Sequence, residues 1–262
     1  MPQIITITKE YFSQYRQDLG FGNQAGVKNF FGAKDIVPTV DFDYLKLINK
    51  RLYEIVDRIN LVVSDDAKLS DVNDFKKEHI DRTFKIMREN GILPTLNNLG
   101  RRPEQVYFSW MRGYVVSNFF LKALGIVFEV DIERISLIGD DDLKNAGTFK
   151  KTPKADLEIH LNKENKIRVE IQSGFTGTND IKQHKVLEAK RVFHEKGIPS
   201  LAIHFDLYNG QVAFVKLDEI EDGHVNWITR QQMEGQTVFN IDQNDFVWKV
   251  TEPPIKYRKI KF

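Results

Sequence analysis

Two acidic side chains in the middle of the sequence have the spacing of partners on a β-hairpin. Asp156 lies in Ala155–Leu161 and Glu170 lies in Ile167–Gln172, two segments whose polar and apolar residues alternate as they do in strands. A turn-forming Asn-Lys-Glu-Asn run separates the two segments. Antiparallel pairing around this turn places Asp156 opposite Glu170 or Gln172, on the face of the hairpin that is turned away from the apolar side chains.

Two opposed carboxylates of this kind could hold a metal ion. Directly opposed residues lie only about 5 Å apart, and two carboxylates at that distance repel unless a cation or a proton lies between them. The sequence has no cysteine, so the expected cation is a hard, oxygen-preferring one such as Mg²⁺. The alternative is a pair of solvated acids on an open sheet face. Apolar neighbours of Glu170 favour a site, as do Gly174 and Gly177, because glycine lets a ligand approach closely.

Two lysines follow the acidic pair at the start of a predicted helix. The helix is expected to begin at a cap formed by residues 178–180 and to end at Gly197. Lys182 shares one side of this helix with Val186, Ala189 and Phe193, and Lys185 lies near the same line. Because helix N-termini attract phosphate, both lysines could steady a phosphate group; the alternative is that they are ordinary surface lysines.

Four positions carry a resemblance to a known family. Pro153, Asp156, Glu170 and the residue two positions later resemble the Pro-Asp…(Asp/Glu)-X-Lys signature of the restriction-endonuclease-like nucleases. The resemblance covers residues 101–217 and includes the order of a helix, the strands that carry the acids, a second helix and a further strand. In that family the Asp and the Glu bind Mg²⁺ with the backbone carbonyl of the intervening residue, here Ile171, and a metal-activated water attacks the phosphodiester.

Gln172 is where the sequence departs from this signature, because lysine is usual there. Glutamine can orient a water molecule but brings no charge. Some type II restriction endonucleases carry Glu-X-Gln, so the resemblance implies that Gln172 positions the water while Lys182 or Lys185 steadies the phosphate. Residues 110–114 and 174–185 are also similar to type II enzymes with short interrupted recognition sites, such as the group that cuts GANTC.

The resemblance implies a type II restriction endonuclease. Such an enzyme cuts double-stranded DNA at a specific sequence, needs Mg²⁺, and leaves 5′-phosphate and 3′-hydroxyl ends. One active site cuts one strand, so a homodimer is expected. The resemblance also implies a cytoplasmic protein of a bacterium or archaeon. Two alternatives stay open: a structure-specific or repair nuclease with the same core, and a non-catalytic DNA-binding relative, which Gln172 suggests. A glycosidase acid pair is disfavoured because few aromatic residues flank the acids.

Basic and polar residues around this core are candidates for DNA contact. The whole chain carries a net charge of only +1, but basic residues outnumber acids between residues 144 and 196 and again at the C-terminus. DNA binding through such patches should weaken steeply with salt. The expected DNA contacts are Lys154, Arg101, Arg102, Arg112, Asn179 and His184.

The rest of the sequence supplies the elements that must position these residues. Apolar residues at helical spacing predict helices over Phe42–Val62 and Val72–Asn90, and an almost wholly apolar helix over Pro103–Gly125 is expected to be buried. Short strands or turns are expected over Ile126–Val130 and Arg134–Ile138, and strands over Leu201–Tyr208 and Gln211–Leu217.

Together these elements predict a mixed α/β fold: a restriction-endonuclease-like mixed β-sheet core flanked by helices, with a mainly helical N-terminal region. The expected parts are residues 1–100 for dimer and DNA contacts, 101–217 for the catalytic core, and 218–262 for a C-terminal segment with a basic tail. The chain has 262 residues, of which 41% are hydrophobic, which is ordinary for a globular protein. The sequence indicates no membrane span, no secretory signal and no nucleotide-binding loop.

Overall fold

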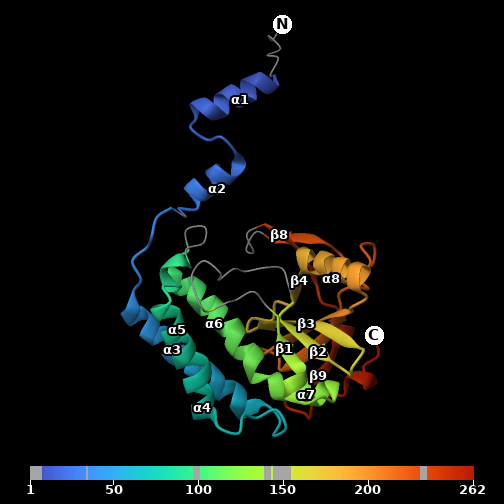
Figure 1. Cartoon of the computed structure of the whole chain (residues 1–262). Coiled ribbons are helices and arrows are strands. Elements are labelled where there is room, and N and C mark those ends of the chain that lie inside the picture. Colours follow the sequence, from blue (N-terminus) through green and yellow to red (C-terminus); the bar gives the residue numbers. More distant parts are fainter. Residues whose placement is uncertain (1–7, 34, 97–100, 139–142, 144–154, 231–234) are drawn as a thin grey trace.

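The computed structural model describes residues 8–33, 35–96, 101–138, 143, 155–230 and 235–262. Its centre is a six-stranded mixed sheet in the order β1-β2-β3-β5-β6-β9, and a three-stranded sheet, β4-β8-β7, accompanies it. Helix α6 (Pro103–Phe119) packs on one face of the larger sheet, α3 (Phe42–Val62) and α7 (Leu121–Phe128) pack against α6, and α8 (Gln183–Lys196) packs on the other face (Figure 1). The predicted mixed α/β class and the helical N-terminal region are therefore confirmed.

The strands of the two sheets come from both the expected core and the C-terminal segment. The larger sheet contains β1 (Ile135–Leu137), β2 (Leu157–His160), β3 (Lys166–Gly174), β5 (Ser200–Asp206), β6 (Gln211–Lys216) and β9 (Phe246–Lys249). The smaller sheet contains β4 (Asp180–Lys182), β7 (Ile228–Arg230) and β8 (Gln236–Asn240). Strands β3 and β5 are parallel, and the other neighbours are antiparallel. Residues 218–262 thus complete both sheets in addition to forming a tail.

The N-terminal helices follow the predicted periodicity, with one irregularity. Helix α3 (Phe42–Val62) has the predicted bounds, and Asp41 caps it by accepting a hydrogen bond from the Tyr44 amide. The helix expected over Val72–Asn90 is instead α4 (Val72–Lys76), a π-helical turn (Lys77–Arg82) and α5 (Thr83–Glu89), because the hydrogen-bond step widens in the middle.

The prediction of one continuous apolar helix over Pro103–Gly125 is wrong in one respect, because the helix is interrupted at Phe120. Helix α6 (Pro103–Phe119) ends at Phe120, and α7 (Leu121–Phe128) continues at an angle of 46°. Phe120 is fully buried and stacks on Phe205 of β5, with ring centroids 4.1 Å apart. The bend therefore directs this ring into the core.

The segment Ile126–Val130 was expected to be a strand or turn, and this expectation is also wrong. Most of it belongs to α7, which ends because Glu129 adopts a left-handed conformation and the Val130 amide bonds the Gly125 carbonyl. No single described helix is long and apolar enough to cross a membrane; α6 and α7 would pass that test only as a bent pair.

Helix α8 (Gln183–Lys196) starts later than predicted. Residues 178–180 were expected to cap it, but Asp180 opens strand β4, which pairs with β8. The predicted end is confirmed, since Gly197 has a positive φ of 65°. Short 3₁₀ turns lie at Leu93–Thr95, Ile132–Arg134, Gln243–Asp245 and Tyr257–Lys259.

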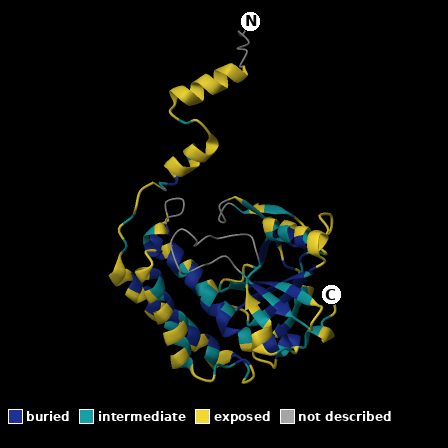
Figure 2. Cartoon of the chain, viewed as in Figure 1, coloured by how far each residue is buried: buried dark blue, intermediate teal, exposed yellow. Residues whose placement is uncertain are grey.

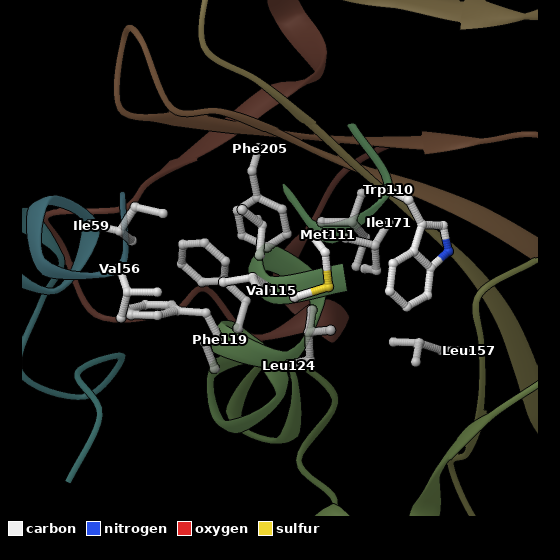
Figure 3. Close-up of a cluster of buried hydrophobic side chains, with 14 of the residues drawn as sticks. Val56, Ile59, Trp110, Met111, Val115, Phe119, Leu124, Leu157, Ile171 and Phe205 are labelled. Carbon is white, nitrogen blue, oxygen red and sulfur yellow. The ribbon is translucent and has the colours of Figure 1, made fainter. Parts of the chain in front are cut away.

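Both faces of the larger sheet are buried, by two separate apolar clusters. The main cluster joins the N-terminal helices to one face of the sheet and includes Val56, Ile59, Met111, Val115, Phe119, Leu124, Leu157, Ile171 and Phe205 (Figures 2 and 3). The smaller cluster lies on the opposite face, where Val186 and Ala189 of α8 contact Ala202 and Ala213. The sheet face that carries Glu170 is therefore covered by a helix rather than open to solvent.

An arm at the N-terminus stands apart from this body. Helices α1 (Lys9–Asp18) and α2 (Gln24–Phe31) project away from the sheet, and neither contains a buried residue (Figures 1 and 2).

Candidate active site

The hairpin of β2 and β3 has the predicted register. Leu157 lies opposite Val169, and Glu158 lies opposite Arg168. Asp156 immediately precedes β2; its amide donates to the Val169 carbonyl (3.1 Å), and its Oδ2 accepts a hydrogen bond from the Ile171 amide (2.7 Å). These two bonds hold Asp156 alongside Glu170.

Glu170 is a buried acid with a lysine beside it. Its side chain is 9% exposed, and its Oε2 lies 2.8 Å from Lys185 Nζ. Burial, followed by the negative charge of Asp156, raises the pKa of Glu170 to about 8, although Lys185 and Lys182 oppose the rise. Asp156 therefore lies near enough to Glu170 for its charge to act on this carboxyl group.

The carboxylates border a groove between α6 and the edge of the hairpin. One hollow of about 340 Å³ is lined by Glu170, Gln172, Lys182 and Lys185, and a neighbouring one of about 300 Å³ by Asp156 and Trp110. Both hollows share Ser109, Gly113 and Ile171 in their walls. Because Ser109 and Gly113 lie one turn apart on α6 and are small, the helix leaves space in front of β3.

Strand β4 and the first turn of α8 position the two predicted lysines. Lys182 is the last residue of β4 and the residue before α8, and Lys185 lies in the first helical turn. The stripe that holds α8 onto the sheet is Val186, Ala189 and Val192 rather than one ending at Phe193, which is half exposed. Lys185 is therefore in the first turn of the helix, as predicted, whereas the prediction is wrong in placing Lys182 within the helix and in ending the stripe at Phe193.

Gln172 faces the same hollow as Glu170, next to a histidine that sequence reasoning missed. Gln172 is the register partner of His204 on β5, and both residues line the larger hollow. A hydrogen bond of 2.8 Å joins His204 Nε2 to Asn179 Oδ1, and Asn179 Nδ2 donates to Asp206 (3.3 Å). Burial lowers the pKa of His204, against the charges of Asp206 and Asp180. The sequence signal that could have indicated this residue is a single histidine within an otherwise apolar strand.

Asp180 is a second residue whose place the sequence did not reveal. It lines the larger hollow, but its carboxylate is occupied by Arg230, with Nε at 3.0 Å and Nη2 at 3.3 Å, and by Asn240 Nδ2 at 3.2 Å. These contacts tie β4 to the two other strands of the small sheet. Asp180 thus supports the segment that presents Lys182, and its charge is neutralised by an arginine.

The residues expected to contact DNA are only partly brought together. Arg112 of α6 lines the larger hollow, and exposed His184 follows Lys182 at the start of α8. Burial, and then Lys182 and Lys185, lower the pKa of His184. Asn179 instead holds His204.

The arginines that precede α6 lie apart from this groove. Arg101 and Arg102 are exposed, and Arg102 Nε lies 3.2 Å from buried Glu104. Neither arginine lines either hollow. Pro153 and Lys154 lie outside the described residues.

The candidate metal ligands Asp156, Glu170 and the Ile171 carbonyl all offer oxygen atoms. Among the described residues, no group of three or more histidine and acidic side chains is arranged to hold a metal ion. Two carboxylates with a backbone carbonyl nevertheless fit Mg²⁺, which usually takes one or two carboxylates and keeps several waters. The chain has no cysteine that would favour a softer ion.

Comparisons of the chain with known protein families, with curated proteins and with solved structures found no match. Any assignment of function therefore depends on the residues of the groove.

Proposed function

We propose that this protein is an Mg²⁺-dependent endonuclease that cuts double-stranded DNA at a specific sequence, in the manner of type II restriction enzymes. The observation that carries the proposal is the meeting of Asp156 and Glu170 beside a groove that also exposes Gln172 and the two lysines of α8. Acids, a water-orienting amide and cations within one groove are the groups that phosphodiester hydrolysis requires.

Asp156, Glu170 and the carbonyl of Ile171 would hold the ion. Bound Mg²⁺ lowers the pKa of a water ligand and offsets the charge of the phosphate. The buried position of Glu170 supports this role, because a carboxylate with a pKa near 8 is costly to ionise without a positive partner.

The role of Lys185 depends on which positive group offsets the negative charge of Glu170. Its ammonium now lies 2.8 Å from Glu170. A dication between the carboxylates would take over that counter-charge, and Lys185 would then be able to contact a non-bridging phosphate oxygen. Lys182 adds a second positive charge at the same wall of the groove. The two lysines could in this way supply the charge that lysine provides in the usual signature.

Gln172 would orient the attacking water, since its amide can both donate and accept hydrogen bonds. Its neighbour on β5, His204, is kept neutral at ordinary pH by burial and would not compete for the phosphate as a cation. On the opposite wall, Arg112 is placed to contact the DNA backbone. His184 would extend this contact, whereas Arg101 and Arg102 lie apart from the groove. Two copies would be needed to cut both strands.

The test is digestion of a sequenced plasmid with Mg²⁺, with the ends mapped to the nucleotide. We expect discrete fragments with 5′-phosphates, and loss of cleavage in Asp156→Ala and in Glu170→Gln. Glu158→Gln is the matched control: this acid lies on the same hairpin but is paired with Lys166 at 2.8 Å outside the groove, so cleavage should persist.

The same digestion separates the alternatives. Smeared products or a preference for branched DNA would indicate a repair nuclease. Full activity in Asp156→Ala would contradict the proposed roles. A non-catalytic DNA-binding protein is the second candidate, because Gln172 replaces the usual lysine and Lys185 Nζ contacts Glu170 Oε2 at 2.8 Å. DNA binding without any Mg²⁺-dependent cleavage of mixed genomic DNA would favour it.

A further inference from the structure

The arm formed by α1 and α2 exposes a large apolar surface. Six large side chains on it range in relative exposure from 50% to 75%: Tyr11, Phe12, Tyr15, Leu19, Phe30 and Phe31. At roughly 100 Å² each, they present about 600 Å². The largest apolar patch of a typical monomer covers about 300–600 Å², so this arm is at the upper end of that range.

The arm has defined local structure although no residue of its two helices is buried. Thr8 and Asn23 cap its two helices, and three aromatic rings, Phe21, Phe30 and Phe31, cluster with centroids 5.4 to 6.1 Å apart. Isolated helices below about 12–15 residues are marginal in water, and these helices have ten and eight. Packing against another surface is therefore needed to hold them.

The charges of the arm argue against a nucleic acid as that surface. Helix α1 carries Lys9, Glu10, Arg16 and Asp18, which cancel, and α2 adds only Lys28. Binding to a phosphate backbone is driven mainly by clustered lysine and arginine, which the arm lacks. An aromatic and nearly neutral surface instead suits the apolar core of a protein interface.

We propose that this arm docks on a second copy of the same chain and holds the protein as a homodimer. Reciprocal exchange of two arms would bury roughly 1,200 Å² of apolar surface on the arms alone, which reaches the lower limit for a stable interface. Exchange of identical elements is a low-cost route to two-fold symmetric dimers. The inference goes beyond the proposed nuclease activity and does not depend on catalysis, although two copies would suit a cut in both strands.

The test is the oligomeric state of the full chain, measured by sedimentation and light scattering over a range of concentrations without DNA or Mg²⁺. We expect a dimer for the wild type. The variant Phe30→Ser/Phe31→Ser should weaken dimerisation by about 10- to 100-fold, since buried aromatic anchors carry most interface energy. Because neither ring is buried in the monomer, the far-UV circular dichroism of the body should persist.

The matched control is Phe193→Ser/Tyr208→Ser, two aromatic residues of comparable exposure on the body, 48% and 72%. This variant should dimerise as the wild type does. A monomeric wild type, equal weakening in both variants, or an arm variant that loses DNA affinity but keeps its oligomeric state would each overturn the inference. A monomer that still cleaves DNA would overturn only the proposed role of the arm in dimerisation. An inactive dimer would overturn only the proposed nuclease activity.

Discussion

Glu170 should make the metal-free protein less stable as the pH rises, and this is the sharpest consequence of the buried acid pair. In the folded state Glu170 keeps its proton up to a pH of about 8, whereas its ordinary value is 4.5. Between these values the folded state binds more protons than the unfolded state, so the free energy of unfolding falls with increasing pH. Each unit of difference corresponds to about 1.4 kcal/mol, which gives a loss of about 3 kcal/mol between pH 5 and pH 8.

The assay is urea unfolding at several pH values in the presence of EDTA, for the wild type and for Glu170→Gln. The variant cannot titrate at this position, so its free energy of unfolding should fall less than that of the wild type as the pH rises. Half-buried His79 and buried His204, whose pKa values are lowered by desolvation, titrate in both proteins and cancel in the difference. Equal pH dependence in the two proteins would refute the reasoning.

Mg²⁺ should reverse this loss in the wild type. Ligand binding to the folded state at one hundred times its dissociation constant stabilises by about 2.7 kcal/mol, and the gain should be larger at pH 8 than at pH 5 because the ion competes with the proton on Glu170. The same addition should leave Glu170→Gln nearly unchanged. Stabilisation of both proteins to the same extent would place the ion elsewhere.

Three further predictions concern other parts of the molecule. Gln172→Lys should alter the rate of cleavage without changing the cut position, which mapped digestion would show. Arg112→Ala should weaken DNA binding and lower the slope of affinity against salt by about one charge, as measured by fluorescence anisotropy at several salt concentrations. Phe120→Ala should cost about 3–5 kcal/mol in urea unfolding, because this ring is fully buried against Phe205; a cost below about 1 kcal/mol would contradict its role in the core.

The parts of the fold that could be predicted are those specified by local sequence. The hairpin followed from alternation on both sides of a polar turn, and its register fixed the neighbourhood of Asp156 and Glu170. Helix α3 followed from its apolar stripe and the end of α8 from Gly197. Each of these features depends on residues close together in the chain, so a short window contains the whole signal.

The parts that could not be predicted depend on distant partners. Asp180 is a residue type that often caps helices, but here it lies in strand β4. It pairs with β8 and binds Arg230, fifty residues later in the chain. Phe120 interrupts a sequence that is helical by every local measure, because its ring has a partner on β5. His204 was missed because the strand that contains it is buried on both faces, so its role depends on Asn179 and Gln172 rather than on any pattern of its own.

The order in which the groove can be assembled during synthesis follows from strand β8. The acids come from one local hairpin and can meet as soon as that hairpin forms. Lys182, by contrast, is held in β4, whose described partner is β8, formed by residues more than fifty positions later. A chain still emerging from the ribosome would therefore carry the paired acids before the lysines are fully anchored, and the complete groove would exist only after residues 236–240 have also emerged.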